Sequence, residues 1–298
     1  MNILVTGASG LIGTALVSSL ASSGHEVTRL VRGQPPSEGK TARWDPMAGT
    51  IETGAIEGVD AVVHLAGENI AERWTSAKKA KIRDSRVKGT QLLCETLTRL
   101  SSPPKTLVSA SAVGYYGDRG DAVLTEDSPP GQGFLSEVCR AWEAATEPAQ
   151  QHGIRVVQLR LGVVLSAKGG ALAKILPPFR LGLGGVLGSG QHYMSWIALD
   201  DAVGAIQHAI ATDVLQGPTN AAAPRAVTNQ EFTKTLGNVL GRPTAIPLPA
   251  FAARLMFGEM ADEVLLASAR IQPTKLVASG YQFRYPELEG ALRHVLAR

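Results

Sequence analysis

The fold of this chain is decided near its start by the stretch Val5-Thr6-Gly7-Ala8-Ser9-Gly10-Leu11-Ile12-Gly13. An apolar run before it predicts a strand over 2–6, and the apolar periodicity after it predicts a helix over 11–23. In a strand–turn–helix of this spacing, Gly7 permits the tight turn, Gly10 lets the backbone approach a ligand, and Gly13 allows close packing. The helix start offers free N–H groups and a positive dipole end to phosphates. The stretch therefore predicts a dinucleotide site formed by Gly7, Ser9, Gly10, Leu11, Ile12 and Gly13.

Strand-like runs alternate with helical patterns through the first half of the chain. Beyond the first strand and helix, strands are predicted over 26–31, 60–65, 105–110 and 154–159, and helices over 75–100 and 134–152. Such alternation predicts an α/β fold of Rossmann type, a doubly wound parallel sheet with helices on both faces. Ligands of such sheets bind beyond the carboxyl ends of the strands. The loop after 60–65 therefore adds Leu65, Ala66 and Gly67 to the predicted cofactor site.

The second half of the chain has a different composition. From about 166 it is rich in Gly and Pro, and Pro243 to Pro249 is typical of a linker. We predict a Rossmann domain over 1–225, with substrate-side insertions over 166–195. A small, mostly helical C-terminal domain of unknown function is predicted over 226–298.

Composition and charge limit the classes of partner. The 298 residues carry 29 basic and 26 acidic side chains, and a net charge of +3 is too small to indicate nucleic acid binding. The two cysteines, Cys94 and Cys139, lack metal-site spacing and fall in predicted helices, which indicates structural thiols in a reducing compartment. The chain opens on a strand rather than a leader-like segment, and no apolar run is long enough to span a membrane. We therefore expect a cytoplasmic protein without metal, nucleic acid or membrane partners.

The end of the second predicted strand indicates which dinucleotide is bound. NAD-binding folds usually place Asp or Glu about 20 residues after the glycines, for the ribose hydroxyls. Here Arg32 ends the strand, and the next acid is Glu38. A carboxylate would repel a 2′-phosphate, whereas a guanidinium binds it with charge-assisted hydrogen bonds worth roughly 1.5–3 kcal/mol each. Arg32 therefore predicts NADP(H), the alternative being a solvated surface arginine.

A second arginine lies on the predicted helix over 75–100. Arg86 shares one helical face with Ile82 and Leu93, so it should point toward the sheet. A buried arginine needs a polar or anionic partner, which is either a cofactor phosphate or an internal salt bridge. The other basic residues are spread around the helix as a mostly solvated surface, and of these Lys81 is included in the predicted cofactor site.

Several motifs together resemble those of the extended short-chain dehydrogenase/reductase superfamily. They are Thr6-Gly-x-x-Gly-x-x-Gly13, Asp60-x-Val-x-His64-Leu-Ala-Gly67, Gly89-Thr90-x-Leu-Leu93, Ser109-x-Ser111, and Trp196-Ile197 before Asp200-Asp201. More narrowly, the chain is similar to the atypical epimerase-family branch of NADP-dependent oxidoreductases sometimes labelled SulA-like. That similarity runs through Arg73-Trp-Thr75, Val227-Thr-Asn229 and Gly258-Glu-Met-Ala261, and it covers nearly the whole chain.

The resemblance implies a catalytic Ser, Tyr and Lys, of which this chain matches only the serine. In the superfamily tyrosine is the acid/base, lysine lowers the pKa of that tyrosine and holds the ribose, and serine hydrogen-bonds the substrate oxygen. Ser111 matches the serine. No tyrosine is followed four residues later by lysine, and the expected helix carries Leu135 and Cys139 in those two positions.

Two replacements for the missing pair, and one alternative without a replacement, are considered. Tyr115 or Tyr116, in the loop after Ser111, would supply a proton, with packing or substrate stacking as the alternative. Glu68 would act as an acid/base if burial raised its pKa. Otherwise the chain performs no hydride chemistry of the usual kind.

The substrate side gives weaker signals. Arg160 and Arg180 are candidates for an anionic substrate, with surface or salt-bridge roles as the alternative. Asp200 and Asp201 are expected to cap the helix that follows them. The main prediction is an NADP(H)-binding, epimerase-like oxidoreductase acting on a small molecule. The alternatives are a catalytically silent NADP(H)-binding sensor or scaffold and, third, a nucleotide-sugar epimerase; a homodimer is expected by analogy.

Overall fold

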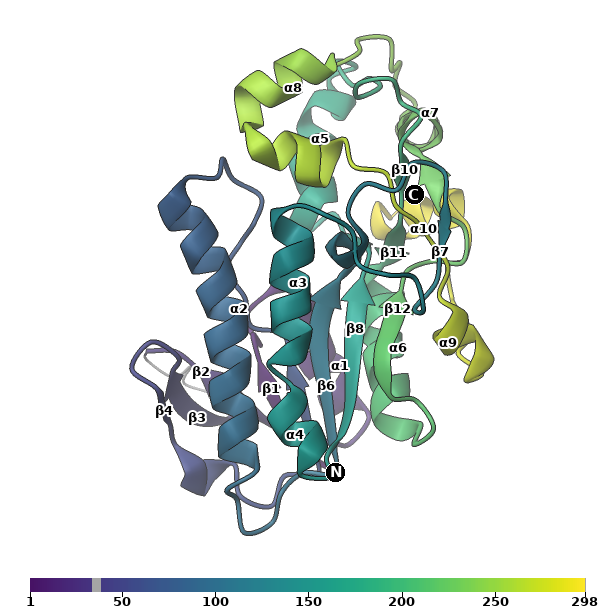
Figure 1. The fold of residues 1–298 in the computed structure, drawn as a ribbon. Coiled ribbons are helices and arrows are strands. Elements are labelled where there is room, and N and C mark those ends of the chain that lie inside the picture. The colour runs from purple at the N-terminus through teal and green to yellow at the C-terminus, as the bar shows by residue number, and fades with distance from the viewer. Residues whose placement is uncertain (34–38, 298) are drawn as a thin grey trace.

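An eight-stranded sheet organises the computed structural model, which describes residues 1–33 and 39–297 (Figure 1). In sheet order its strands are β12 (Gly217–Ala221), β8 (Arg155–Leu161), β6 (Thr106–Ala112), β5 (Ala61–His64), β1 (Asn2–Thr6), β2 (Glu26–Val31), β3 (Lys40–Asp45) and β4 (Thr50–Ile51). All neighbours are parallel except β3 and β4. The strand order reverses between β1 and β5, so the loops after these two strands border the crevice where such sheets bind ligands. The predicted fold class is confirmed.

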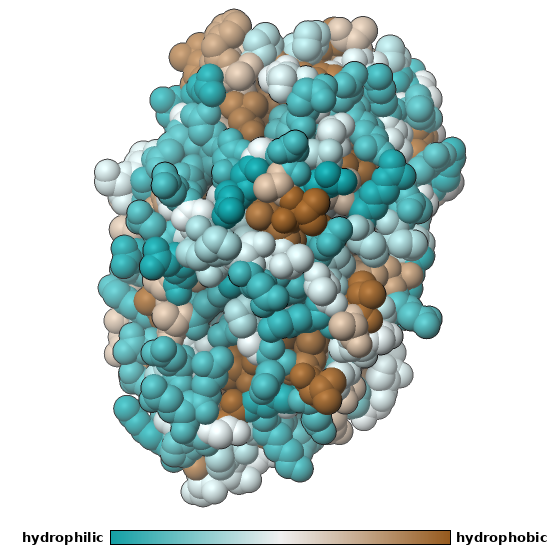
Figure 2. All heavy atoms as spheres, turned by 45° about the vertical axis from the view of Figure 1, so that its right-hand side comes forward, coloured by the Kyte–Doolittle hydropathy of each residue, from teal (hydrophilic) through white to brown (hydrophobic). Residues whose placement is uncertain are grey.

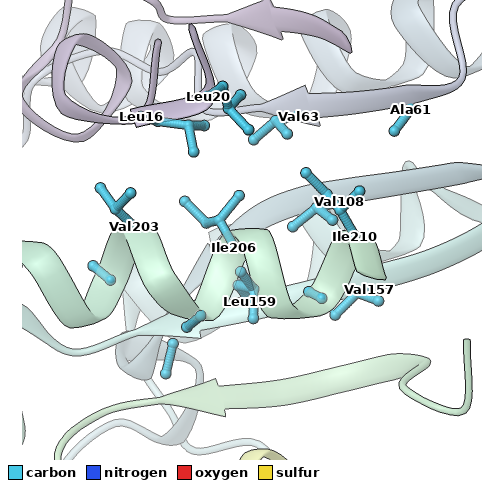
Figure 3. Close-up of a cluster of buried hydrophobic side chains, with 14 of the residues drawn as sticks. Leu16, Leu20, Ala61, Val63, Val108, Val157, Leu159, Val203, Ile206 and Ile210 are labelled. Atoms are coloured by element: carbon cyan, nitrogen blue, oxygen red, sulfur yellow. The ribbon is translucent and has the colours of Figure 1, made fainter. Parts of the chain in front are cut away.

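Helices cover both faces because neighbouring strand residues point in opposite directions. One face packs on α1 (Leu11–Ser22) and α6 (Leu199–Ala211), and the other on α2 (Ser76–Leu97), α3 (Phe134–Ala144) and α4 (Glu147–Gln151). In β1, Ile3 and Val5 join the first core and Leu4 joins the second. Figure 3 shows α6 directing Val203 and Ile206 into the first core.

A third core lies outside the two faces of the large sheet. It joins β9 (Val163–Leu165), α5 (Gly170–Arg180), β11 (Trp196–Ala198), α7 (Asn229–Leu240) and α10 (Leu288–Val295). The remaining elements are η1 (Thr53–Ala55), η2 (Val113–Tyr116), β7 (Val123–Leu124), β10 (Tyr193–Met194), β13 (Val227–Thr228), α8 (Ala250–Phe257), η3 (Ala261–Leu265), β14 (Arg270–Ile271) and α9 (Thr274–Ala278). The third core draws on residues from both sides of position 225, and the predicted domain boundary there stays a prediction.

Several elements differ from the sequence expectation, among them the helix over 134–152 and the sheet strands β3, β4 and β12. The helix predicted over 134–152 is divided, since α3 ends at Ala144 and α4 restarts at Glu147 with Pro148 in its first turn. Proline is tolerated in a first turn but not in a helix interior. Strand β3 was not predicted, although Ala42 and Trp44 alternate with exposed residues and are buried.

No helix in the described parts of the chain is both long and apolar enough to cross a membrane. Figure 2 shows a mostly hydrophilic face on which hydrophobic residues form small, separate patches.

Candidate functional site

The glycine turn between β1 and α1 has the geometry expected from its spacing. Gly7 has φ +66°, and a Cβ there would lie 2.7 Å from the backbone of Leu65. A Cβ at Gly13 would overlap the carbonyl oxygen of Gly7. Gly10 is the N-cap of α1 and makes no side-chain cap, and the first turn carries no acid. The turn therefore brings bare backbone and a helix N-terminus to the crevice, next to the exposed Ser9, and this arrangement suits an anion.

A buried polar network holds the glycine turn against the loop after β5. The Thr6 hydroxyl accepts the N–H groups of Leu65 at 3.1 Å and Ala66 at 3.2 Å, and it lies 2.7 Å from His64 Nδ1. His64 Nε2 lies 3.0 Å from the Thr90 hydroxyl on α2. Since Thr6 accepts twice, we assign its hydrogen to Nδ1 and the imidazole hydrogen to Nε2. Burial lowers the pKa of His64 to about 4, so the ring is neutral.

Three cations act on Glu68 at the end of that loop. Lys78 binds its carboxylate at 2.7 Å, and this hydrogen bond lowers the pKa of Glu68, with smaller effects from the charges of Lys81 and Arg32. Arg32 and Lys81 are both exposed, and the charges of both act on Glu68 in the loop after β5. The hypothesis of Glu68 as a general acid with a raised pKa is wrong, because its pKa moves in the opposite direction. Glu38 lies outside the described residues.

Arg86 points toward the sheet, as its helical face predicted. Its Nη1 donates to the carbonyl oxygens of Glu68 at 3.0 Å and Ile82 at 3.1 Å. Its guanidinium lies 5.0 Å from the ring centroid of Trp142 on α3 and packs against Gly67, where a Cβ would be 3.2 Å from Cζ. Its hydrogen-bond partners within the described chain are thus backbone carbonyls, and the internal salt bridge considered above is not formed.

Ser111 belongs to a buried ion-pair network rather than to an open site. It is 2% exposed, and its hydroxyl donates to Glu143 Oε1 at 2.6 Å. Arg160, also 2% exposed, donates to both Glu143 oxygens at 2.9 Å. The expected role of Ser111, orienting a substrate oxygen, is therefore corrected, since its only hydrogen is used by Glu143. Of the two roles considered for Arg160, the structure shows the salt bridge.

The two candidate tyrosines differ in burial and in hydrogen bonding. Tyr116 is fully buried; its hydroxyl donates to Asn220 at 2.7 Å and accepts from Arg160 at 2.8 Å. Burial raises the pKa of Tyr116. Tyr116 is thus corrected from proton donor to a member of the buried Arg160 hydrogen-bond network. Tyr115 is half-buried with its ring 3.5 Å from the Arg160 guanidinium, and it stays the tyrosine candidate.

Leu135 and Cys139, at the expected Tyr and Lys positions, face η2. A Cβ on Gly114 would lie 3.3 Å from Leu135 Cβ and 4.0 Å from Cys139 Sγ. Burial raises the pKa of Cys139 to about 12. Neither side chain can exchange protons near neutral pH, so this level of the crevice is apolar on the α3 side.

Asp200 and Asp201, in the first turn of α6, bind residues of the C-terminal segment. Asp201 is fully buried and accepts the N–H groups of Arg284 at 2.7 Å and Tyr285 at 3.0 Å. Asp200 pairs with His294 at 2.7 Å, and α6 has no side-chain cap. Both acids lie in the first turn of α6, but neither forms the expected side-chain cap. Arg180 is exposed at the end of α5.

The C-terminal segment also caps α3, which sequence reasoning missed. Glu263 accepts the N–H groups of Phe134 at 2.9 Å and Leu135 at 3.0 Å. Gly133, with φ +98°, leaves room for this carboxylate. The signal was Gly133 itself, a helix N-cap without a capping side chain.

We expect Glu263→Ala to lower the free energy of unfolding by about 1–2 kcal/mol, because two helix N–H groups lose their charged acceptor. Glu259→Ala is the matched control, since its carboxylate makes only a half-exposed ion pair with Lys79 at 2.8 Å. Such pairs contribute about 0–1 kcal/mol. Equal urea midpoints for the two variants would contradict the assigned cap.

Comparisons with known proteins agree with this architecture. A model of the NAD dependent epimerase/dehydratase family matches residues 3–221. The chain belongs to that family. A second match, to a domain of unknown function (DUF1731), covers residues 248–295. The resemblance to epimerase-family short-chain dehydrogenases/reductases is confirmed.

Close relatives extend over the whole chain. An epimerase family protein of Mycobacterium bovis is 46% identical over 297 residues, which are 99% of this chain and 98% of that protein. The crystal structure of human epimerase family protein SDR39U1 with NADPH is 39% identical, with a TM-score of 0.92 and 100% of both chains covered. A nucleoside-diphosphate sugar epimerase from Corynebacterium glutamicum is 38% identical, with a TM-score of 0.81 over 99% of this chain and 58% of that one. The family likeness thus includes the C-terminal segment that caps α3.

Proposed function

We propose that this chain binds NADP(H) and acts as an epimerase-like oxidoreductase on a small-molecule substrate. The observation that carries the proposal is the bare glycine turn at the switch point, with the exposed Arg32 just beyond β2, the strand next to β1. The human relative crystallised with NADPH supports the choice of cofactor.

The residues present fit this cofactor. Gly7, Gly10 and Gly13 leave the space that side chains would fill, and the start of α1 would hold the pyrophosphate. Arg32, an exposed cation just beyond β2, would hold the 2′-phosphate. We place the exposed Lys81 with it because the charges of both act on Glu68. When bound, NADP(H) supplies the hydride donor or acceptor.

Calorimetric titration of NADPH, NADP, NADH and NAD tests the cofactor assignment. We expect the phosphorylated forms to bind more tightly, and Arg32→Ala to weaken them roughly tenfold to hundredfold by removing charge-assisted hydrogen bonds. NADH binding should change little in the same variant.

Arg99→Ala is the matched control, because Arg99 is an exposed arginine just beyond the far end of α2, paired with Glu95. Arg99→Ala should leave the preference for the phosphorylated cofactors unchanged. Equal affinity for NADPH and NADH in the wild type would refute Arg32 as the selector, and no binding of either would refute the proposed function.

A second candidate function follows from the corrected site. Ser111 and Tyr116 are occupied by the Arg160 network, and apolar groups fill the positions of the tyrosine and lysine. These observations favour a catalytically silent NADP(H)-binding sensor or scaffold. In that case NADPH binds without turnover on a carbonyl panel, and partner binding changes with cofactor occupancy. A nucleotide-sugar epimerase ranks third, because its chemistry would need the tyrosine and lysine that this chain lacks.

We also propose a cytoplasmic location and a homodimer. The location rests on the two unpaired cysteines, which are buried in α2 and α3. The homodimer rests on analogy alone.

A further inference from the structure

The sheet order assigns the two halves of a bound dinucleotide to opposite sides of the glycine turn. The turn follows β1, with β2 on one side and β5 then β6 on the other. If Arg32 at the end of β2 takes the adenosine 2′-phosphate, the nicotinamide riboside extends toward β5 and β6. This step rests on the NADP(H) binding proposed above.

Arg86 lies on that second side. Its guanidinium packs on Gly67 in the loop after β5 and faces Trp142 on α3, the helix next to α2 in Figure 1. Cys139, at the expected lysine position, lies one turn before Trp142 on the same helix, and the charge of Arg86 acts on its thiol. Arg86 therefore brings a positive charge, from a different helix, close to the place where the superfamily carries lysine.

Only one nitrogen of the Arg86 guanidinium, Nη1, is held by hydrogen bonds within the described residues. Nη1 donates to the carbonyl oxygens of Glu68 and Ile82, whereas Nη2 and Nε have no acceptor within residues 1–33 and 39–297. The side chain is half-buried, so the edge formed by Nη2 and Nε does not have the full hydration of a surface arginine. A rigid donor edge of this kind suits a ribose hydroxyl or carbonyl oxygen.

We infer that Arg86 replaces the missing lysine, donating from its free edge to an oxygen of the nicotinamide-riboside half of NADP(H). Its position separates it from Arg32, which is exposed and lies on the adenosine side. Arg86 is thus a binding residue for the second half of the cofactor and not a second 2′-phosphate ligand.

Binding of two different ligands tests the two halves of the site independently. NADPH carries both nucleosides, and adenosine 2′,5′-bisphosphate carries only the adenosine half. We expect Arg86→Met to weaken NADPH binding roughly tenfold or more, because one charged hydrogen bond is lost. The affinity for the bisphosphate should equal that of wild type. Arg86→Lys should be intermediate, because it keeps the charge and loses the planar fork. Arg83→Met, which removes an exposed charge from the same helix, should change neither affinity.

The outcomes also separate this inference from the proposed function. Binding of the bisphosphate shows that each variant is folded at the site. Equal weakening of both ligands by Arg86→Met, or no weakening of NADPH, would overturn the inference while leaving NADP(H) binding intact. Failure of wild type to bind either ligand would instead overturn the proposed function. If Arg86→Met does not fold, wild-type NADPH affinity in Arg86→Lys would overturn the inference by itself.

Discussion

Arg160→Met is expected to lower the free energy of unfolding by about 3–5 kcal/mol, because it leaves the Glu143 carboxylate buried without its counter-ion. The pair is bidentate at 2.9 Å, and the two side chains are only 2% and 10% exposed. Ser111 alone would still donate to the carboxylate. Equilibrium unfolding in urea measures the loss, and Arg160→Met with Glu143→Leu should recover much of it by removing both charges.

Arg254→Met is the matched control for this experiment. Arg254 pairs with Asp262 at 2.8 Å, almost the same separation, but both side chains are more than half exposed. Exposed pairs contribute about 0–1 kcal/mol, so the difference between the variants isolates the effect of burial. If Arg160→Met costs no more than Arg254→Met, the buried network does not stabilise the fold.

The fold could be predicted from local patterns that the structure preserves. The glycine turn at Gly7 and the apolar runs of β1, β5 and β6 are short-range signals, and each appears where expected. Strand β3 was missed because its buried residues, Ala42 and Trp44, alternate with charged ones over too short a run. Its identity as a strand depends on pairing with β2, a contact that no local pattern contains.

The candidate site was predicted less completely, for a related reason. Motif matching placed Ser111 just beyond an apolar strand, whereas it lies within β6, and the direction of its hydroxyl is set by Glu143, 32 residues away on α3. The same holds for Glu263, which reaches α3 from the C-terminal segment. Arg86 was predicted to point inward from helical periodicity alone, whereas its carbonyl partners depend on how the loop after β5 folds.

Acidification is expected to destabilise the fold through His64. Burial lowers the pKa of this imidazole from 6.5 to about 4 in the folded protein. Between these values the unfolded chain binds a proton that the folded protein does not, so unfolding becomes easier as pH falls. The stabilisation is complete above the unfolded pKa and is lost as pH drops toward the folded pKa. A shift of this size corresponds to about 3 kcal/mol.

His64→Gln isolates this effect, since glutamine does not titrate yet bonds to Thr6 and Thr90 hydroxyls. Burial also lowers the pKa values of His192 and His208, so the wild-type curve includes their contributions. The difference between wild-type and His64→Gln unfolding free energies should therefore shrink between about pH 7 and pH 4.5, as linkage requires. The exposed His152→Gln should follow wild type, and a His64→Gln curve parallel to wild type would exclude the effect.

Protonation of His64 should also weaken cofactor binding. Protonation of His64 at Nδ1 removes the acceptor for the Thr6 hydroxyl, whose oxygen holds the N–H groups of Leu65 and Ala66. That loop borders the glycine turn at Gly7, so its displacement would disturb the pyrophosphate cradle. NADPH affinity at low pH should thus fall more in wild type than in His64→Gln. Identical pH profiles of NADPH binding would separate the stability role of His64 from any role at the cofactor site.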